Sequence, residues 1–306
     1  MTTWGDLRQR AEAQLRDTSA ARPEVEARWM VERVSGYDGA ELVINETERA
    51  PAPAVQHLDD MLERRAGGEP LQYVLGRWNF LELDLLVDRR VLVPRPETEV
   101  VARAAIDEAV RLGQRRGRRD GWLAADTSYA VADLGTGSGA IALALACELP
   151  DAEVWATDVS DDALAVARAN LAGVGTAATR VRVRSGSWFS ALPPELQGVL
   201  KVIVSNPPYV AEHEVADLPR DVADWEPRGA LVSGPTGMEA IEELVAGARA
   251  WLDPRGGALV LELAPHQAER AAELAIIAGF GDVHVERDLT GRDRVLVARV
   301  SGEPKA

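Results

Sequence analysis

Residues 132–146, "ADLGTGSGAIALALA", join an apolar strand pattern to an apolar helix pattern through a glycine-rich turn. Gly135, Gly137 and Gly139 let the backbone of such a turn approach a ligand closely, because glycine has no Cβ and tolerates a positive φ. The helix begins directly after the turn, and a helix N-terminus favours negative charge. This order is typical of the first unit of an open α/β sheet.

Strand and helix patterns alternate on both sides of this turn, from Trp122 onwards. Runs of β-branched residues indicate strands, and apolar residues at helical spacing indicate helices that pack on a sheet. Strands are expected at 130–134, 153–157, 180–185, 201–205, 257–263, 281–286 and 294–300, and helices at 139–149, 161–171, 237–252 and 266–278. The alternation predicts an α/β fold with a doubly wound, mostly parallel sheet. The last two strands have no helix between them and are expected to pair as an antiparallel hairpin at one edge.

The chain before residue 77 has helical periodicity instead. A first helix is expected near residues 4–15. A second begins at Pro23 and ends before Gly36, and a third begins after Pro53 and ends at Gly67. Three short helices predict a small bundle that needs a neighbour to bury enough surface.

Residues 77–94 connect this bundle to the sheet. Their strand-like alternation surrounds Asp88–Arg90, which is expected to form the turn of a β-hairpin. A further helix is expected from Pro96, because proline suits the first helical turn. The predicted domains are a helical bundle at 1–76, a β-hairpin linker at 77–94 and the α/β domain at 95–306.

The composition of the 306 residues is that of a soluble globular protein, with 46% hydrophobic and 27% charged residues,. No apolar run is long enough for a membrane span, and residues 1–20 lack the pattern of a signal peptide, so a cytoplasmic location is expected. The single cysteine, Cys147, excludes an internal disulfide and is expected to be a small core residue,. Four histidines show no ligand spacing, so no metal site is predicted,.

The formal net charge of −15 bears on the class of partner. A protein that binds a nucleic-acid duplex normally carries a basic face, because contacts to phosphates supply most of the affinity. The one dense basic run, at 111–121, contains three glycines and is interpreted as a solvated loop. The alternative is a docking patch for an acidic partner surface.

Asp158 lies at the end of the second expected strand, where a carboxylate can accept hydrogen bonds from both hydroxyls of a ribose,. A glycine turn and this acid fit either a dinucleotide or S-adenosylmethionine. Gly139, Asp133 and the proline element described next favour the methyl donor. Asp133 is expected to reach the donor's ammonium group, whereas it would repel a pyrophosphate there.

The fourth expected strand ends in "VSNPPYV", residues 204–210, and prolines cannot extend a sheet,. The prolines instead hold two acceptors in one orientation, the side-chain oxygen of Asn206 and the carbonyl of Pro207. The ring of Tyr209 is expected to lie against a planar group between them. Two acceptors beside an aromatic ring suit a planar –NH2 group, which adenine, cytosine and the glutamine side chain all carry.

Such a site suits methyl transfer to an amide nitrogen, which is a poor nucleophile because its lone pair is delocalised. Hydrogen bonds to both of its hydrogens increase the electron density on the nitrogen and aim it at the methyl group. Positioning then supplies most of the acceleration. No general base is required before transfer.

The chain resembles the peptide chain release factor glutamine methyltransferases, the family also called PrmC or HemK. The resemblance covers nearly the whole chain and rests on six segments in the family's order: "GEPLQYVLG" (68–76), "LVPRPETE" (92–99), "ADLGTGSGAIALALA" (132–146), "ATDVSDDALAVARAN" (156–170), "SWFSAL" (187–192) and "VSNPPYV" (204–210). It implies a Rossmann-like class I S-adenosylmethionine-dependent methyltransferase sheet. It also implies N5-methylation of the glutamine in the GGQ motif of class I release factors, which tunes translation termination.

The resemblance also implies roles for individual residues. S-adenosyl-L-methionine would be held by Gly135, Thr136, Gly137, Ser138, Gly139, Asp158, Trp188 and Asn206. The glutamine would be held by Asn206, Pro207, Pro208 and Tyr209, with Asn206, Pro207 and Tyr209 as the catalytic set. Trp188 would lie beside the adenine, and core packing is its alternative role. The bundle at 1–76 would recognise the release factor, and the enzyme is expected to be a monomer without nucleic-acid or membrane partners.

Three positions limit the resemblance. Many relatives have an acidic residue where this chain has Ser187, so a hydroxyl or the backbone would have to contact the adenine amino group. Glu262 is assigned no role, because family members vary there. The "RPETE" element is interpreted as partly a helix cap and partly a wall of the cofactor pocket, with Arg95 and Glu97 as weaker candidates.

Two other functions remain compatible with parts of the sequence. A nucleic-acid adenine-N6 methyltransferase can share the proline element, but it predicts a basic face and a base-reading domain. A non-catalytic cofactor-binding or interaction protein predicts a damaged site, whereas every element here is intact.

Overall fold

The computed structural model describes residues 2–18, 20–117 and 129–301, with the side chains of 114–117 left aside. The chain divides into two compact units. Unit 1 comprises Met1–Trp78 together with Leu218–Trp225, and unit 2 comprises Asn79–Asp217 together with Glu226–Ala306.

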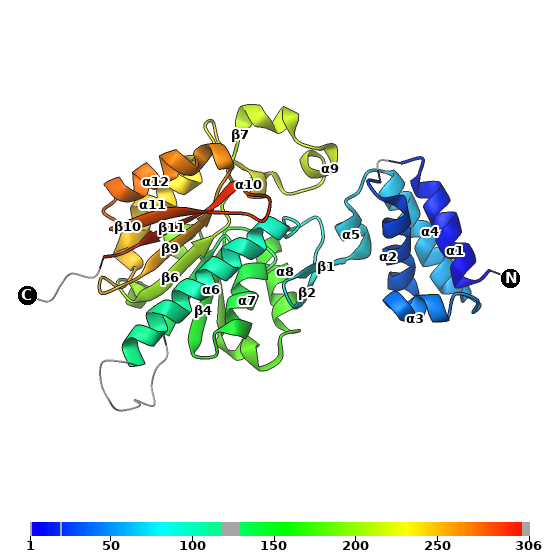
Figure 1. The fold of residues 1–306 in the computed structure, drawn as a ribbon, viewed down its shortest axis with the longest axis horizontal. Coiled ribbons are helices and arrows are strands. Elements are labelled where there is room, and N and C mark those ends of the chain that lie inside the picture. Colours follow the sequence, from blue (N-terminus) through cyan, green and yellow to red (C-terminus); the bar gives the residue numbers. More distant parts are fainter. Residues whose placement is uncertain (1, 19, 118–128, 302–306) are drawn as a thin grey trace, which may run out of the picture. The chain divides into compact units, whose positions relative to one another are not determined.

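Unit 1 is helical (Figure 1). Its helices are α1 (Trp4–Leu15), α2 (Pro23–Ser35), α3 (Gly39–Ile44), α4 (Ala52–Ala66), α5 (Leu71–Leu75) and α9 (Arg220–Ala223). The three predicted helices are confirmed as α1, α2 and α4. Thr3 caps α1, and Gly36 ends α2 in the left-handed conformation,. Leu7, Met30 and Leu58 are fully buried in the core between these helices.

A two-stranded sheet follows, made of β1 (Arg77–Phe80) and β2 (Leu83–Leu86). The predicted hairpin therefore exists, but its predicted turn is wrong. The strands are joined by the two residues between them, of which Leu81 has a φ of 51°. Asp88 closes a separate turn beyond β2, because its carboxylate accepts the backbone N–H of Arg90 over 3.0 Å and pairs with the Arg90 guanidinium.

Unit 2 is built on a seven-stranded sheet with the order β10-β11-β9-β6-β3-β4-β5. The strands are β3 (Tyr129–Leu134), β4 (Ala152–Asp158), β5 (Val181–Ser185), β6 (Leu200–Ser205), β9 (Ala258–Glu262), β10 (Asp282–Arg287) and β11 (Asp293–Arg299). The five strands from β9 to β5 pair in parallel, whereas β11 pairs antiparallel with both β9 and β10. The doubly wound sheet and its antiparallel hairpin at one edge are confirmed.

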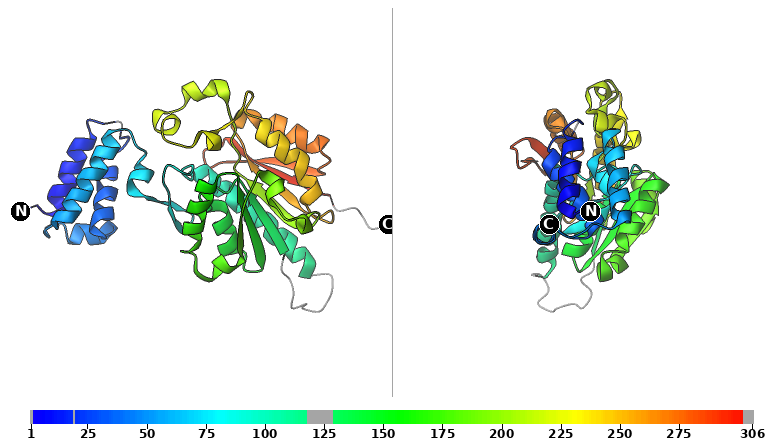
Figure 2. Two further views of the ribbon diagram at one scale, coloured as in Figure 1. Left: turned by 180° about the vertical axis from the view of Figure 1, so that it is seen from behind. Right: turned by 90° about the vertical axis from the view of Figure 1, so that its right-hand side faces the viewer.

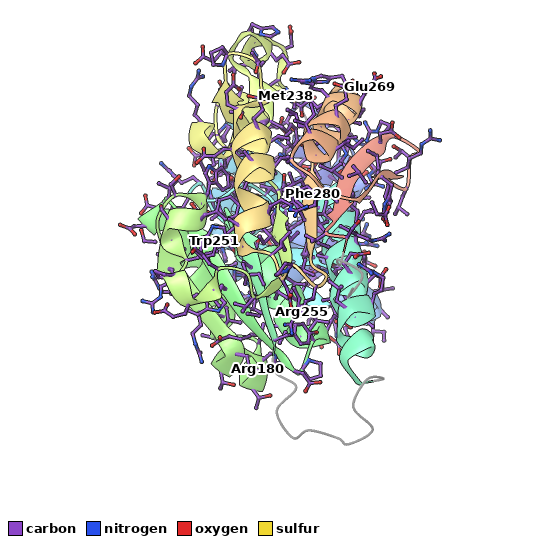
Figure 3. All side chains as sticks on the ribbon, turned by 90° about the vertical axis from the view of Figure 1, so that its left-hand side faces the viewer. Arg180, Met238, Trp251, Arg255, Glu269 and Phe280 are labelled. Carbon is purple, nitrogen blue, oxygen red and sulfur yellow. The ribbon has the colours of Figure 1, made fainter. Side chains whose placement is uncertain are left out.

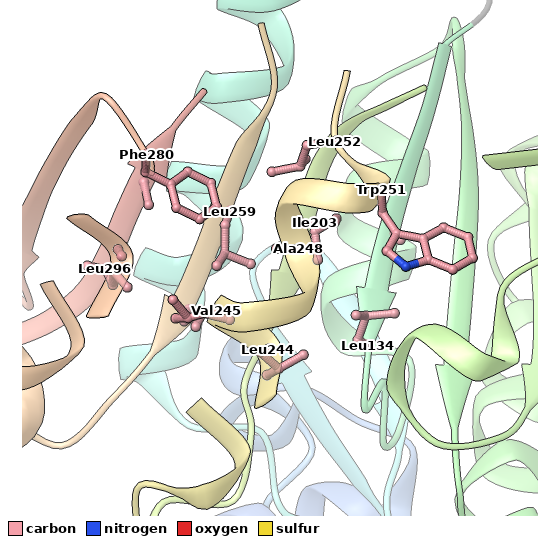
Figure 4. Close-up of a cluster of buried hydrophobic side chains, with 14 of the residues drawn as sticks. Leu134, Ile203, Leu244, Val245, Ala248, Trp251, Leu252, Leu259, Phe280 and Leu296 are labelled. Carbon is pink, nitrogen blue, oxygen red and sulfur yellow. The ribbon is translucent and has the colours of Figure 1, made fainter. Parts of the chain in front are cut away.

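Helices cover both faces of this sheet (Figure 2). They are α6 (Pro96–Gly117), α7 (Ala140–Glu148), α8 (Asp161–Leu171), α11 (Glu239–Trp251) and α12 (Ala268–Ile277). Met238 and Trp251 mark the two ends of α11 in Figure 3. Leu244, Val245 and Ala248 of α11 pack against alternate residues of the central strands, among them Ile203 and Leu259 (Figure 4). All four predicted helices of this part and the helix from Pro96 are confirmed.

The connections include short elements that the sequence did not reveal. Val210–Ala211 (β7) and Val232–Gly234 (β8) form a second two-stranded sheet. The remaining short helices are η1 (Gly175–Arg180), η2 (Trp188–Ala191), η3 (Pro194–Leu196), η4 (Glu212–Asp217), α10 (Arg228–Leu231) and η5 (Pro265–Gln267).

Two predictions about individual segments are corrected. Helix α6 continues to Gly117, so the first part of the basic run at 111–121 is helical and not a loop. The rest of that run lies outside the described residues. Cys147 is exposed and not a core residue, although residues 140–146 of the same helix are buried. It lies in the last turn of α7.

Within the ranges described, none of the helices combines the length and apolarity that crossing a membrane requires. The same residues contain no group of three or more His, Cys, Asp or Glu side chains arranged to hold a metal ion.

Candidate active site

The glycine turn after β3 adopts the conformation that its residues allow. Gly135, Gly137 and Gly139 have φ values of 74°, 57° and 86°, all in the left-handed region,. The backbone N–H groups of Gly135 and Thr136 both donate to the carbonyl of Thr157 over 2.8 Å, which fixes the turn to the end of β4. Gly139 also allows close helix packing, because a Cβ there would lie 3.4 Å from the Cβ of Ala167.

Asp158 at the end of β4 faces this turn. Its Oδ2 accepts the N–H of Gly137 over 2.9 Å, and its Oδ1 accepts the N–H of Ser160 over 2.9 Å. Burial raises the pKa of Asp158 above its ordinary value, and these backbone hydrogen bonds oppose the rise,. Each oxygen keeps a second lone pair, so the carboxylate can still accept hydrogen bonds from a ligand's hydroxyl groups.

A cavity of about 380 Å³ lies at this edge of the sheet, entirely within unit 2. Eight of the residues predicted for the site line it: Gly135, Thr136, Gly137, Ser138, Asp158, Trp188, Asn206 and Pro208. Three predicted residues, Gly139, Pro207 and Tyr209, lie outside its wall. Thr98 also lines the cavity, in agreement with the prediction that the "RPETE" element forms part of the pocket wall. Sequence reasoning missed seven other lining residues: Arg90, Val91, Leu92, Pro94, Pro227, Gly229 and Ala230.

Trp188 forms one end of the cavity. Its φ of 42° places a bulky residue in the left-handed region, which is rare,. A Cβ at Gly135 would lie 3.3 Å from the Trp188 ring, so the indole rests directly on the glycine turn. The ring also packs against the core beneath α11, so both predicted roles of Trp188 have support. Ser187 lines the cavity, and its carbonyl accepts both the N–H and the hydroxyl of Ser190.

The proline element follows β6, which is the neighbour of β3 in the sheet. The hydroxyl of Ser205, the last residue of β6, donates to the carbonyl of Leu134, the last residue of β3, over 2.6 Å. Asn206 is half-buried and lines the cavity, whereas Pro207 is buried. The glycine turn and the proline element are therefore presented from adjacent strand ends that are joined by a hydrogen bond.

The backbone carbonyl of Tyr209 is in close contact with two residues that do not line the cavity, Gln267 and Gly237. This carbonyl accepts the side-chain amide of Gln267 over 2.9 Å. Gly237 approaches the same carbonyl so closely that a Cβ there would lie 2.6 Å from the oxygen. Burial raises the pKa of the Tyr209 phenol, so the ring stays neutral.

A buried carboxylate that sequence reasoning left without a role stands behind the proline element. Glu262, the last residue of β9, is 1% exposed. Its Oε2 accepts the hydroxyl of Thr98 over 2.7 Å, and its Oε1 accepts the Tyr209 hydroxyl over 3.4 Å. Burial raises the pKa of Glu262 to about 7,. The only signal in the sequence is an acid that directly follows four apolar residues of a central strand.

Some residues of the "RPETE" element form ion pairs with other segments, and one lines the cavity. Arg95 pairs with the buried Glu226 over 2.5 Å, and Glu97 pairs with Arg292 over 3.1 Å. Of this element, the residue that lines the cavity is Thr98.

Asp133 supports the glycine turn, and its contact with a donor's ammonium group stays a prediction, since its Oδ1 is buried without a hydrogen-bond partner among the described residues. It lies beneath the glycine turn, 1% exposed, and is not part of the cavity wall. Its Oδ2 accepts the hydroxyl of Thr136 over 2.6 Å and the N–H of Ala142 over 3.0 Å. Burial raises the pKa of Asp133 to about 7. Asp133 thus ties the turn to the first residues of α7.

Comparisons with known proteins agree with this architecture. The PrmC N-terminal domain family matches residues 6–76, and the methyltransferase small domain family matches residues 121–220. The catalytic domain of hMettl16 shares the fold, with a TM-score of 0.51 and 15% sequence identity over 83% of this chain and 84% of that chain. The sheet therefore has the class I S-adenosylmethionine methyltransferase fold.

Similar full-length relatives carry a single name. The release factor glutamine methyltransferase of Deinococcus radiodurans is 38% identical, over 97% of this chain and 98% of its own length. The protein of the same name from Bordetella pertussis is 38% identical, over 89% of this chain and 93% of its own length. Identity at this level over nearly the whole length shows that the chain belongs to the release factor glutamine methyltransferase family.

Proposed function

We propose that this protein transfers the methyl group of S-adenosyl-L-methionine to the side-chain amide nitrogen, N5, of the glutamine in the GGQ motif of class I release factors. The observation that carries the proposal is the placement of Asn206 beside the glycine turn, on the neighbouring strand end. The names of the relatives supply the substrate class.

The residues of the cavity fit the methyl donor. The volume is adequate for a small-molecule ligand, and the left-handed glycines let the backbone approach it,. Asp158 would bind the ribose hydroxyls, Trp188 would cover the adenine, and Gly135–Gly139 with Thr136 and Ser138 would form the remaining wall. When bound, S-adenosylmethionine supplies an electrophilic methyl group on its sulfonium. No metal takes part in this proposal.

The proline element would bind the acceptor. The side-chain oxygen of Asn206 and the carbonyl of Pro207 accept the two hydrogens of the glutamine –NH2, and Pro208 fixes the direction of the Pro207 peptide. Pro207 itself does not line the cavity, so this contact requires its backbone oxygen to reach the amide from beside Asn206 and Pro208, which do. The neutral ring of Tyr209 lies against the amide plane. These contacts hold the nitrogen in line with the methyl group, which accounts for most of the acceleration.

In this proposal, residues 1–76 recognise the release factor, 77–94 link the two parts, and 95–306 carry out the transfer. The family matches at 6–76 and 121–220 support a separate N-terminal domain and a methyltransferase domain. The protein acts in the cytoplasm as a monomer, without a direct nucleic-acid or membrane partner. The net charge of −15 supports a protein substrate over a nucleic acid,.

Incubation with isotopically labelled S-adenosylmethionine and purified release factors, followed by peptide mass spectrometry, tests the proposal. We expect a single added methyl group on the GGQ glutamine. Transfer to DNA or RNA in place of the release factor would overturn it in favour of the adenine-N6 alternative.

Two variants separate the two halves of the site. Asn206→Ala is expected to lower kcat about 100-fold or more, because one of two acceptors is lost, while S-adenosylmethionine binding persists. Asp158→Ala is expected to weaken donor binding first. Calorimetry of donor binding beside the kinetics distinguishes the two, and loss of donor binding in both variants would contradict this division of roles.

A further inference from the structure

Three side chains from distant parts of the sequence form one chain of hydrogen bonds that begins in the cavity wall, at Asn206 and Thr98, and ends at the buried Glu262. The amide nitrogen Nδ2 of Asn206 lies 3.1 Å from the hydroxyl of Thr98, and that hydroxyl lies 2.7 Å from Oε2 of Glu262. Thr98 is in the first turn of α6, Asn206 follows β6, and Glu262 ends β9. Thr98 is 4% and Glu262 1% exposed, so the contact between these two side chains is buried.

The chemistry of the groups gives this chain a direction. A carboxylate only accepts hydrogen bonds, and a threonine hydroxyl has a single hydrogen. The hydroxyl hydrogen of Thr98 therefore points to Glu262, and a lone pair of its oxygen faces Asn206. The group that Asn206 can offer to a lone pair is its –NH2, so its Oδ1 is turned away from Thr98.

We propose that Glu262, acting through Thr98, is the positioning residue that fixes the Asn206 amide with its oxygen toward the acceptor, which makes the site selective for an –NH2 group. The inference rests on the proposed function. With the Asn206 amide reversed, the site would present two hydrogens to a group that itself has only hydrogens to donate. Transfer would then fail although every residue of the site is present.

The groups around Glu262 give this arrangement a pH dependence. Thr98 and Glu97 face Glu262 from α6, Tyr209 from the proline element, and Arg294 from β11. Burial and the charge of Glu97 raise the pKa of Glu262, and Arg294 and the two hydroxyl donors lower it, with about 7 as the result. A proton on Oε2 would make Glu262 a donor to Thr98, and the Thr98 hydrogen would then turn to Asn206. Activity should therefore fall on the acid side of this pKa.

Three variants test the positioning role. Thr98→Val, which keeps the shape but removes the hydroxyl, is expected to lower kcat about 10- to 100-fold, because the amide is no longer held in one orientation. Thr98→Ser restores the hydroxyl and should recover most of kcat. Thr98 lines the cavity, so donor affinity should be measured in both variants. A positioning role predicts that it changes much less than kcat, since neither variant alters Asp158 or the glycine turn.

Glu262→Gln separates positioning from packing. An amide oxygen still accepts the Thr98 hydrogen but does not titrate, so the variant should stay active at about pH 8.5 and lack the acid limb that is expected for the wild type near pH 7,. The matched control is Glu108→Gln. Glu108 lies on the same helix as Thr98, is 5% exposed, and pairs with Arg111 of that helix and with Arg299 of β11. It should keep the acid limb. Wild-type kcat in Thr98→Val, or an unchanged acid limb in Glu262→Gln, would overturn the proposal.

A measurement without turnover keeps this inference distinct from the proposed function. The chain has four asparagines, so ¹⁵N-asparagine labelling gives few side-chain amide signals to assign. The Asn206 –NH2 signals should shift as the pH passes through about 7 in the wild type and in Glu108→Gln, but not in Glu262→Gln. Signals that titrate in all three proteins would refute the role of Glu262 even if the release factor is methylated. Absence of methylation with the expected titration would refute only the proposed substrate.

Discussion

In the proposed mechanism, transfer depends on which end of the Asn206 side-chain amide faces the substrate. Asparagine is nearly symmetric in shape but not in hydrogen bonding, since one end accepts and the other donates. The backbone carbonyl of Pro207 has no such ambiguity, because it can only accept. The site therefore combines one acceptor fixed by covalent geometry with one fixed by its hydrogen-bond partners.

Gly237 is expected to control the position of Tyr209, which lies two residues after Pro207. With a φ of +80° and a Cβ that would lie 2.6 Å from the Tyr209 carbonyl, Gly237→Ala must displace the proline element. We expect kcat to fall about 10- to 100-fold. Gly291→Ala is the matched control, because Gly291 has a φ of +84° and open space around it. Both variants should lose about 1–2 kcal/mol of unfolding free energy from the left-handed conformation.

Chemical denaturation of the two variants measures the cost of the strained backbone, which both share. Steady-state kinetics measures the effect of displacing the proline element, which is expected only in Gly237→Ala. Equal kcat values in Gly237→Ala and Gly291→Ala would show that the close contact behind Tyr209 has no effect on transfer.

At the residue level, sequence reasoning identified the cavity residues that directly follow strands, but it missed other lining residues and the contact between Thr98 and Glu262. Asn206 and Asp158 stand at strand ends next to recognisable turns, so their positions follow from the sheet. Thr98 and Glu262 are 164 positions apart, and a contact across that separation leaves no local pattern. Cys147 was misplaced because apolar neighbours predict burial, whereas exposure depends on which side of a helix end is covered.

Among the elements, the glycine turn and the start of α7 depend on one buried carboxylate. Because the pKa of Asp133 in the folded protein, about 7, lies above its ordinary value of 3.8, the folded state retains a proton that the unfolded chain releases. The stability that this proton contributes is complete below about pH 4 and is lost as the pH rises through about 7,.

Asp133→Asn should therefore flatten the pH dependence of the unfolding free energy between about pH 4 and about pH 7,. An asparagine oxygen still accepts from Thr136 and Ala142, and its neutral side chain has no proton to lose. Urea unfolding at several pH values checks this. A slope as steep as that of the wild type would show that other groups, Glu262 among them, account for the pH dependence.

The elements that the sequence predicted are those with enough length to show a period. All seven strands of the large sheet and its helices were placed because β-branched runs and helical spacing repeat along them. Helices α3 and α5 have six and five residues, and β7 and β8 have two and three, too few for any period. The hairpin turn was misplaced because Asp88 does form a turn, but one closed by its own side chain and not by strand pairing.

On the scale of the whole molecule, each unit has its own hydrophobic core, and a change within one core should be felt there first. Leu58 is fully buried in the helical unit, and Leu58→Ala should cost about 2–5 kcal/mol of its stability,. We expect a higher KM for the release factor and unchanged affinity for S-adenosylmethionine, because the cavity lies wholly in unit 2.

Leu259→Ala is the control for this experiment, since Leu259 is equally buried but belongs to β9. Differential scanning calorimetry should show one unfolding transition for each unit. Leu58→Ala should lower the midpoint temperature of the transition of unit 1, and Leu259→Ala that of unit 2. If Leu58→Ala lost as much donor affinity as Leu259→Ala, the assignment of the helical unit to substrate recognition would be contradicted.

The hydrogen bond between Ser205 and Leu134 has a consequence for how the reaction is timed. Parallel neighbours in a sheet lie about 4.8 Å apart, and this extra bond joins β3 and β6 at the point where both strands end,. In the proposed mechanism, the glycine turn that binds the donor and the proline element that binds the acceptor are thus held at a fixed distance before either reactant binds. Bringing the methyl group to the nitrogen would then need no closing motion between these two strand ends.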